Sequence, residues 1–396
     1  MVLYLQKDIM TKPLLKSVLV IFCVTLLFAC QPESKVVSDS FTVSGTIKGL
    51  DTEYMSYGYR NAEGKRVFDS VFVENESFTY TGKFSEPGFI IFWPNVESTM
   101  KRTGRGYYPA KSSQFAFLAS PGDNITFEGE ITDFVDAYPT GTPANDDLAS
   151  INRRIFPLLN KAVNLQLRID KLEDADPLKQ VLADSVSDYN SQVDGIKEQF
   201  VTSHPTSQAA IWYLSDMMVR SQVTQEKAIS IFKSFDSSLK DYTYYKEVAM
   251  RVEGIESTLI GKTMPNFVTN LTMDGSDFEL NSLRGKHVLI DFWGTWCGPC
   301  IAEMPKVKEY QQKYKDELVI LGVNSGDTKE KILKFMEPKG YDWKQVLAGD
   351  GDESLVLKLN VAGFPTKFIL SPEGEILHRF VGDTEEAFDV LDEILQ

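Results

Sequence analysis

The stretch Leu289-Ile-Asp-Phe-Trp-Gly-Thr-Trp-Cys-Gly-Pro-Cys300 decides the fold of the C-terminal part of the chain. An almost continuous apolar run, Val288 to Trp293, has the length and composition of a central strand covered on both faces. Beyond it, apolar residues recur at helical spacing from Ile301 to Val307. The sequence therefore predicts that Cys297 and Cys300 lie where a buried strand passes into a helix.

This position favours thiol chemistry. The first turn of a helix stabilises a thiolate, because unpaired backbone N–H groups and the positive end of the helix dipole lie there. In comparable sites the thiol pKa falls from about 8.5 to roughly 7. We therefore expect Cys297 to be the exposed nucleophile and Cys300 to resolve the mixed disulfide. The three histidines of the chain are scattered and do not complete a zinc site with the cysteines, so no metal and no other cofactor is expected.

Two acidic residues are candidates for proton exchange with the thiols. Asp291 lies in the run that should be buried, where an ionised carboxylate is costly without a partner. Glu303 lies one helical turn beyond Cys300, on the same side of the helix. Both are assigned here as catalytic, although an acid in a first helical turn is also favoured by the dipole alone.

The residues around the cysteines resemble a known family. Trp-Cys-Gly-Pro-Cys (296–300) is the thioredoxin active-site motif, and with Glu303 the longer stretch resembles the membrane-tethered TlpA/ResA-type thiol-disulfide oxidoreductases. Asp291 matches the buried acid of thioredoxin, and Pro305 matches its helix-kinking proline. Members of the ResA type often lack the thioredoxin acid and rely on the glutamate, whereas this chain has both. The resemblance covers roughly residues 258–396 and implies an α/β thioredoxin-like fold.

The same resemblance assigns a substrate-binding loop. Gly363-Phe-Pro-Thr366 matches the loop whose cis-proline faces the active-site sulfurs. It implies that the Phe364–Pro365 bond is cis and that the backbone of Phe364 pairs with an extended substrate segment. We also expect Trp296 to shape the exposed rim of the site and Trp293 to belong to the core.

The N-terminus has the pattern of an export signal. Lysines precede the apolar stretch Ser17 to Ala29, which is too short for a comfortable membrane span. A small residue directly before Cys30 resembles the lipobox of bacterial lipoproteins, which implies acylation of Cys30. Residues 1–30 are thus interpreted as a lipoprotein signal that anchors the protein to a membrane in the periplasm or cell envelope. An uncleaved anchor and a plain secretory signal are the alternatives.

Two further regions precede the redox domain, so the fold is predicted to be multidomain. Residues 41–137 alternate in strand fashion between turns rich in Pro and Gly and predict an antiparallel β-sandwich. This region resembles the β-domain of unknown function that often precedes thioredoxin-like domains in lipoproteins of the Bacteroidetes. Residues 145–257 predict a module of short helices, interpreted as a spacer or as a surface for docking or dimerisation.

These patterns predict a membrane-anchored reductase of protein disulfides. By analogy with TlpA/ResA-type proteins, a membrane thiol carrier would donate the electrons, and apocytochrome c is a candidate client. A net charge of −15 argues against a nucleic-acid partner. One alternative is a peroxiredoxin-like peroxidase, although this chain has Ile290 and Gly294 where peroxiredoxins have proline and threonine. The other is a ligand-binding lipoprotein with an auxiliary redox domain.

Overall fold

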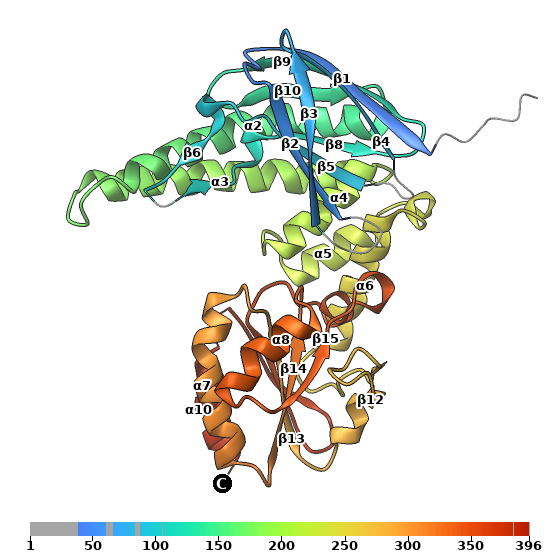
Figure 1. The fold of residues 1–396 in the computed structure, drawn as a ribbon, viewed down its shortest axis with the longest axis vertical. Coiled ribbons are helices and arrows are strands. Elements are labelled where there is room, and N and C mark those ends of the chain that lie inside the picture. The colour runs from blue at the N-terminus through green and yellow to red at the C-terminus, as the bar shows by residue number, and fades with distance from the viewer. Residues whose placement is uncertain (1–38, 61–65, 84–87, 105, 383, 396) are drawn as a thin grey trace, which may run out of the picture.

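The structure, a computed structural model, describes residues 39–60, 66–83, 88–104, 106–382 and 384–395. Three regions follow one another in space as they do along the chain: a β-sheet region, a group of helices and a C-terminal α/β domain (Figure 1). The expected lipoprotein signal and its Cys30 lie outside the described residues. Within the described ranges, no helix combines the length and apolar character needed to cross a membrane.

Strands β6 (Lys101–Arg102) and β7 (Tyr107–Tyr108) form a two-stranded sheet, and the rest of the N-terminal region is built on one eight-stranded sheet. Its strands are β1 (Ser40–Lys48), β2 (Tyr54–Arg60), β3 (Arg66–Glu74), β4 (Ser77–Lys83), β5 (Gly88–Trp93), β8 (Phe115–Ala119), β9 (Asn124–Ile131) and β10 (Val135–Thr140). The strand order is β10-β9-β1-β4-β3-β2-β5-β8. One pair departs from the expected antiparallel pattern: β1 and β9 are parallel, because β9 crosses over from the far edge of the sheet and enters beside β1 in the same direction.

Aromatic side chains from both ends of this sheet meet in one core. Phe115 and Phe117 on β8 lie with their ring centroids 5.3 and 5.9 Å from the ring of Phe127 on β9. Phe117 also lies 6.0 Å from Phe41 on β1. Because β8 forms one edge of the sheet and β9 lies near the other, the sheet folds over on itself and buries one face, as in a sandwich.

Helices follow from residue 143 to residue 257: α2 (Pro143–Ile169), α3 (Leu178–Ser203), α4 (Gln208–Val219), α5 (Gln225–Phe232) and α6 (Thr243–Ser257). The expectation of short helices is wrong for α2 and α3, which have 27 and 26 residues. These two pack against each other, and such pairing buries an apolar stripe that neither helix could bury alone.

The helices and the sheet share one hydrophobic core. Leu118 and Tyr138 from the strands belong to the same buried cluster as the helical residues. Phe89 on β5 stacks on Trp212 of α4 with ring centroids 3.8 Å apart. These two regions therefore form a single packed unit.

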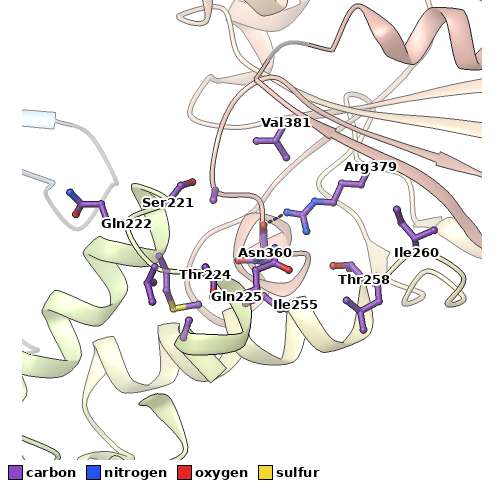
Figure 2. Close-up of a pocket in the computed structure, with 15 residues that line it drawn as sticks. Ser221, Gln222, Thr224, Gln225, Ile255, Thr258, Ile260, Asn360, Arg379 and Val381 are labelled. Atoms are coloured by element: carbon purple, nitrogen blue, oxygen red, sulfur yellow. Dashed lines mark hydrogen bonds between the residues drawn. The ribbon is translucent and has the colours of Figure 1, made fainter. Parts of the chain in front are cut away.

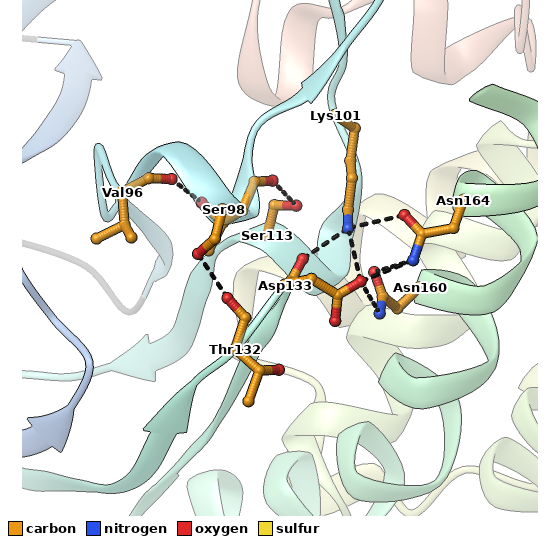
Figure 3. Close-up of polar contacts among 9 residues, drawn as sticks. Val96, Ser98, Lys101, Ser113, Thr132, Asp133, Asn160 and Asn164 are labelled. Carbon is orange, nitrogen blue, oxygen red and sulfur yellow. Dashed lines mark hydrogen bonds and ion pairs between the residues drawn. The ribbon is translucent and has the colours of Figure 1, made fainter. Parts of the chain in front are cut away.

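A buried polar network also joins the sheet to α2 (Figure 3). Lys101 is 3% exposed, and its Nζ donates to the backbone carbonyl of Asp133 at 2.6 Å and to Oδ1 of Asn164 at 3.0 Å. The amides of Asn160 and Asn164 donate to the Asp133 carboxylate at 2.9 and 2.7 Å. Burial lowers the pKa of Lys101, and the charge of Asp133 opposes that shift. The network satisfies its own donors and acceptors and has a structural role.

The C-terminal domain is built on a five-stranded sheet of order β15-β14-β13-β16-β17. Its elements are β11 (Val268–Thr269), β12 (Phe278–Glu279), β13 (His287–Trp293), α7 (Gly298–Lys313), β14 (Leu318–Asn324), α8 (Lys329–Met336), β15 (Lys344–Leu347), α9 (Leu355–Lys358), β16 (Thr366–Leu370), β17 (Ile376–Val381) and α10 (Glu386–Ile394). Odd-numbered residues of the central strand β13 pack with α7, α8 and α10. Even-numbered residues pack with α9 and β12. Both faces of the strand are covered, as its apolar sequence predicts.

Helix α6 meets the C-terminal domain at Gly254. A Cβ atom at this position would lie 2.7 Å from the carbonyl oxygen of Lys358 and 2.9 Å from the backbone N of Asn360. The absence of a side chain thus allows α6 to touch the backbone at the end of α9. Through this contact the helices pack against the C-terminal domain.

We expect Gly254→Ala to lower the free energy of unfolding by about 1–3 kcal/mol, as overpacking of a filled site does. The matched control is Gly195→Ala on α3, where a Cβ meets no atom within 4 Å. That change should be neutral or stabilising by up to about 1 kcal/mol, because alanine favours a helix over glycine. Denaturant titration of both variants measures the change in the free energy of unfolding. If Gly254→Ala and Gly195→Ala changed it equally, the prediction that a side chain at position 254 clashes with the end of α9 would be wrong.

Candidate active site

The two cysteines lie at the junction of β13 and α7, as the sequence predicts. Cys297 is the N-cap of α7, and its Sγ accepts a hydrogen bond from the backbone N–H of Cys300 at 3.2 Å. Pro299 lies in the first turn, where its missing N–H costs no helical hydrogen bond. The sulfur of Cys297 is therefore placed where backbone donors and the helix dipole stabilise negative charge.

Cys297 and Cys300 form a disulfide, with their Cα atoms 5.3 Å apart. The structure is thus the oxidised form. Cys297 is only 4% exposed and Cys300 is 2% exposed, so the expectation of an exposed nucleophile is wrong for this state. The reason is packing: both cysteines belong to a buried apolar cluster, and Phe364 lies against it.

The loop before β16 adjoins this disulfide. The Phe364–Pro365 bond is cis, which confirms the expectation. The ring of Phe364 lies 5.1 Å from that of Trp296, which is 55% exposed and donates its Nε1–H to the carbonyl of Ser325. Trp293 is fully buried. Trp296 therefore lies at the exposed rim of the site and Trp293 in the core, as the sequence predicts.

The backbone of Phe364 is available for pairing. Among the residues that the structure describes, neither its N–H nor its C=O has a hydrogen-bond partner. The regular pairing of β16 with β13 begins only at Thr366. A free donor and acceptor at this position suit the addition of an extended peptide segment.

A buried ionic network lies on the same side of β13 as α7. Lys367, with no exposed surface, places its Nζ 3.0 Å from Oδ1 of Asp291 and 2.7 Å from Oε2 of Glu303. Asp291 and Lys367 are direct cross-strand partners of β13 and β16. Thr384 donates its hydroxyl to the same Glu303 oxygen at 2.5 Å. The two acids that the sequence proposes are therefore bridged by one cation.

Lys367 is a residue of the site that the sequence motifs did not predict. Burial lowers the pKa of this lysine, but the charges of Asp291 and Glu303 outweigh burial, so the pKa lies above its ordinary value. The sequence does mark Lys367, because it is the single charged residue in the otherwise apolar strand Thr366-Lys-Phe-Ile-Leu370. Such a residue, directly after a cis-proline loop, indicates a buried ion pair.

The described residues contain no group of three or more His, Cys, Asp or Glu side chains that could hold a metal ion. The chemistry that the site offers is that of the two sulfurs. A disulfide at a helix N-terminus beside a cis-proline, in a thioredoxin-like sheet, defines a thiol-disulfide oxidoreductase.

Comparison with known proteins identifies the family. The Redoxin family matches residues 259–395. The thiol-disulfide oxidoreductase ResA of Bacillus subtilis (strain 168) is 36% identical over 147 residues, which are 37% of this chain and 79% of that protein. ResA of Bacillus cereus (strain ZK / E33L) is 36% identical over 129 residues, 32% of this chain and 73% of that protein. The chain therefore belongs to the ResA-type thiol-disulfide oxidoreductases of the thioredoxin family.

Two further comparisons concern structures and the N-terminal region. A putative protein disulfide isomerase from Bacteroides thetaiotaomicron, solved in solution, is 30% identical, with 35% of this chain and 91% of that chain covered and a TM-score of 0.31. The thioredoxin domain of a thiol-disulfide oxidoreductase from Bacteroides vulgatus is 26% identical, with 35% of this chain and 99% of that chain covered and a TM-score of 0.31. Residues 41–148 match DUF4369, a domain of unknown function.

Proposed function

We propose that the protein is a membrane-anchored, extracytoplasmic reductase of protein disulfides that works through the Cys297-Gly-Pro-Cys300 dithiol. The observation that carries the proposal is the unpaired backbone of Phe364 next to this pair. An extended client segment that pairs there would be held beside the sulfurs. Trp296 and Pro365 would complete the contact surface.

The reaction follows from the placement of the cysteines. In the reduced protein the Cys297 thiolate attacks one sulfur of a client disulfide, and the other client sulfur leaves as a thiolate that takes up a proton. Cys300 then loses its proton and attacks the Cys297 sulfur. This step forms the Cys297–Cys300 disulfide and releases the second client thiol. Two electrons pass to the client, and the oxidised form is the product state.

Asp291, Glu303 and Lys367 are proposed to manage the protons of this cycle. The carboxylates would exchange a proton with Cys300 during resolution. Lys367 contacts both acids and is a positioning residue that holds the two carboxylates at one cation.

The location and partners of the protein are also proposals. Lipid attachment at Cys30 would hold the redox domain at a membrane in the periplasm or cell envelope. A membrane thiol carrier would then reduce the Cys297–Cys300 disulfide after each turnover. Apocytochrome c before haem attachment is a candidate client, by analogy with TlpA/ResA-type proteins.

A redox titration tests the direction of electron flow. The full-length chain, purified in detergent, is equilibrated with dithiothreitol or glutathione buffers, and the Cys297–Cys300 state is followed by thiol alkylation. A reductase predicts a midpoint potential near or below about −250 mV, close to that of thioredoxin. A value near about −120 mV would make the protein an oxidant, and a pair that does not exchange with the buffer would rule out the proposed function.

A further inference from the structure

A cleft of about 840 Å³ lies between the helices and the redox domain (Figure 2). One wall comes from the helices, with Met218 of α4, Gln225 of α5 and Ile255 of α6. The other comes from the redox domain, with Asn360 and Arg379. The volume falls in the range of sites that bind ligands in proteins, roughly 300–1,000 Å³.

The cleft is continuous with the proposed substrate loop. Its wall includes Ala362, two residues before Phe364. It also includes Val381, which is the cross-strand partner of Thr366. The next residue, Gly382, donates its N–H to the carbonyl of Pro365 at 2.9 Å. An extended segment paired with Phe364 advances about 3.3 Å per residue and would enter the cleft within a few residues.

The walls of the cleft suit a polypeptide. Leu259, Ile260 and Val381 are large apolar residues that are 47%, 67% and 49% exposed at its edge. On the helical wall, Ser221, Gln222, Thr224 and Gln225 lie next to the apolar residues Val223 and Ala228. Such a mixture offers apolar contact area together with hydrogen-bond donors and acceptors.

Arg379 is the one charged residue among the described residues that line the cleft. Its guanidinium donates a hydrogen bond to the carbonyl of Asn360 at 2.6 Å. The Cζ atom of Arg379 lies 5.3 Å from the ring centroid of Phe368. Its Nε–H is buried without a hydrogen-bond partner, and in the described part of the chain no carboxylate pairs with it. Burial lowers the pKa of Arg379, which fits a cation whose counter-ion is absent. An arginine without a carboxylate partner is complementary to a carboxylate from outside.

We propose that this cleft binds the client segment that flanks the reacting disulfide, and that Arg379 selects clients with an acidic side chain close to that cysteine. The inference rests on the proposed function and adds a substrate class to it. The helical module then forms half of the substrate site.

The test uses peptides that carry one disulfide and a single glutamate placed about two to six residues from the cysteine, the span of an extended chain across the cleft. Matched peptides have glutamine instead. The value of kcat/KM for each peptide is divided by the rate on hydroxyethyl disulfide, a neutral small substrate, measured for the same protein. We expect the glutamate peptide of the best spacing to be preferred about tenfold, as a charge-assisted hydrogen bond would give. The preference should vanish in Arg379→Gln.

A second pair of variants probes the opposite wall without touching the redox domain. Gln225→Trp would fill the cleft from α5 and is expected to raise KM for the peptides. Glu226→Trp, the next residue and outside the lining, is the control and should leave KM unchanged. If the glutamate peptides were not preferred, or if both tryptophan variants changed KM equally, the inference about the cleft would be wrong and the proposed function would stand. Failure to reduce hydroxyethyl disulfide would instead overturn the proposed function.

Discussion

Replacing Cys297 by serine is expected to lower the rate of disulfide reduction on the order of 10³-fold or more, because the hydroxyl is a far weaker nucleophile than a thiolate. Cys297 caps α7 and its sulfur already accepts the N–H of Cys300, so the attacking atom is the one that the helix N-terminus stabilises. Reduction of insulin disulfides, followed by turbidity with dithiothreitol as the electron donor, measures this loss.

Replacing Cys300 by serine should have a different consequence. The first attack still takes place, but no thiol resolves the intermediate, so a one-to-one mixed disulfide between Cys297 and the client accumulates. Mass spectrometry under non-reducing conditions detects that adduct. If the adduct formed through Cys300 in the Cys297 variant and not through Cys297 in the Cys300 variant, the assigned roles would be reversed.

Replacing Lys367 by methionine is expected to lower the free energy of unfolding by about 3–5 kcal/mol. The change keeps a similar volume but leaves Asp291, which is 2% exposed, as a buried charge without its partner, and removal of one member of a buried pair costs this much. The pKa of Lys367 lies above its ordinary value of 10.5, so its contribution is complete below about pH 10.5 and is lost only at higher pH. Denaturant titration at neutral pH is the measurement.

Two comparisons make this prediction specific. Lys358→Met removes an exposed pair with Glu353 and should cost at most about 1 kcal/mol. In the double variant Asp291→Asn/Lys367→Met, the cost should be well below the sum of the single changes, since the buried charge of Asp291 is removed together with its partner, and only Glu303 loses its cation. A loss of stability similar to that of Lys358→Met would contradict the buried network.

The local elements of the redox domain could be predicted because short-range patterns specify them. Apolar runs of strand length predict strands at Leu318–Asn324 and Thr366–Leu370, and helical spacing predicts a helix at Lys329–Met336. Strands β14 and β16 and helix α8 have these bounds. Continuous apolar runs mark buried strands, and helical spacing marks a covered helix face. The edge strand β15 was missed, because a four-residue strand carries too little pattern to detect.

By itself the sequence determined the chemistry of this protein: a pair of cysteines at a strand-to-helix junction, in a chain long enough for several domains. Tertiary structure decided what surrounds that pair. Register between distant strands places Lys367 opposite Asp291, and the crossing of α7 brings Glu303 to the same cation. Residues of α5 and of the end of β17 line the same cleft, which contains Arg379. These features arise from long-range packing, whose partners no local periodicity specifies, whereas the thiol site depends on neighbours within a few residues along the chain.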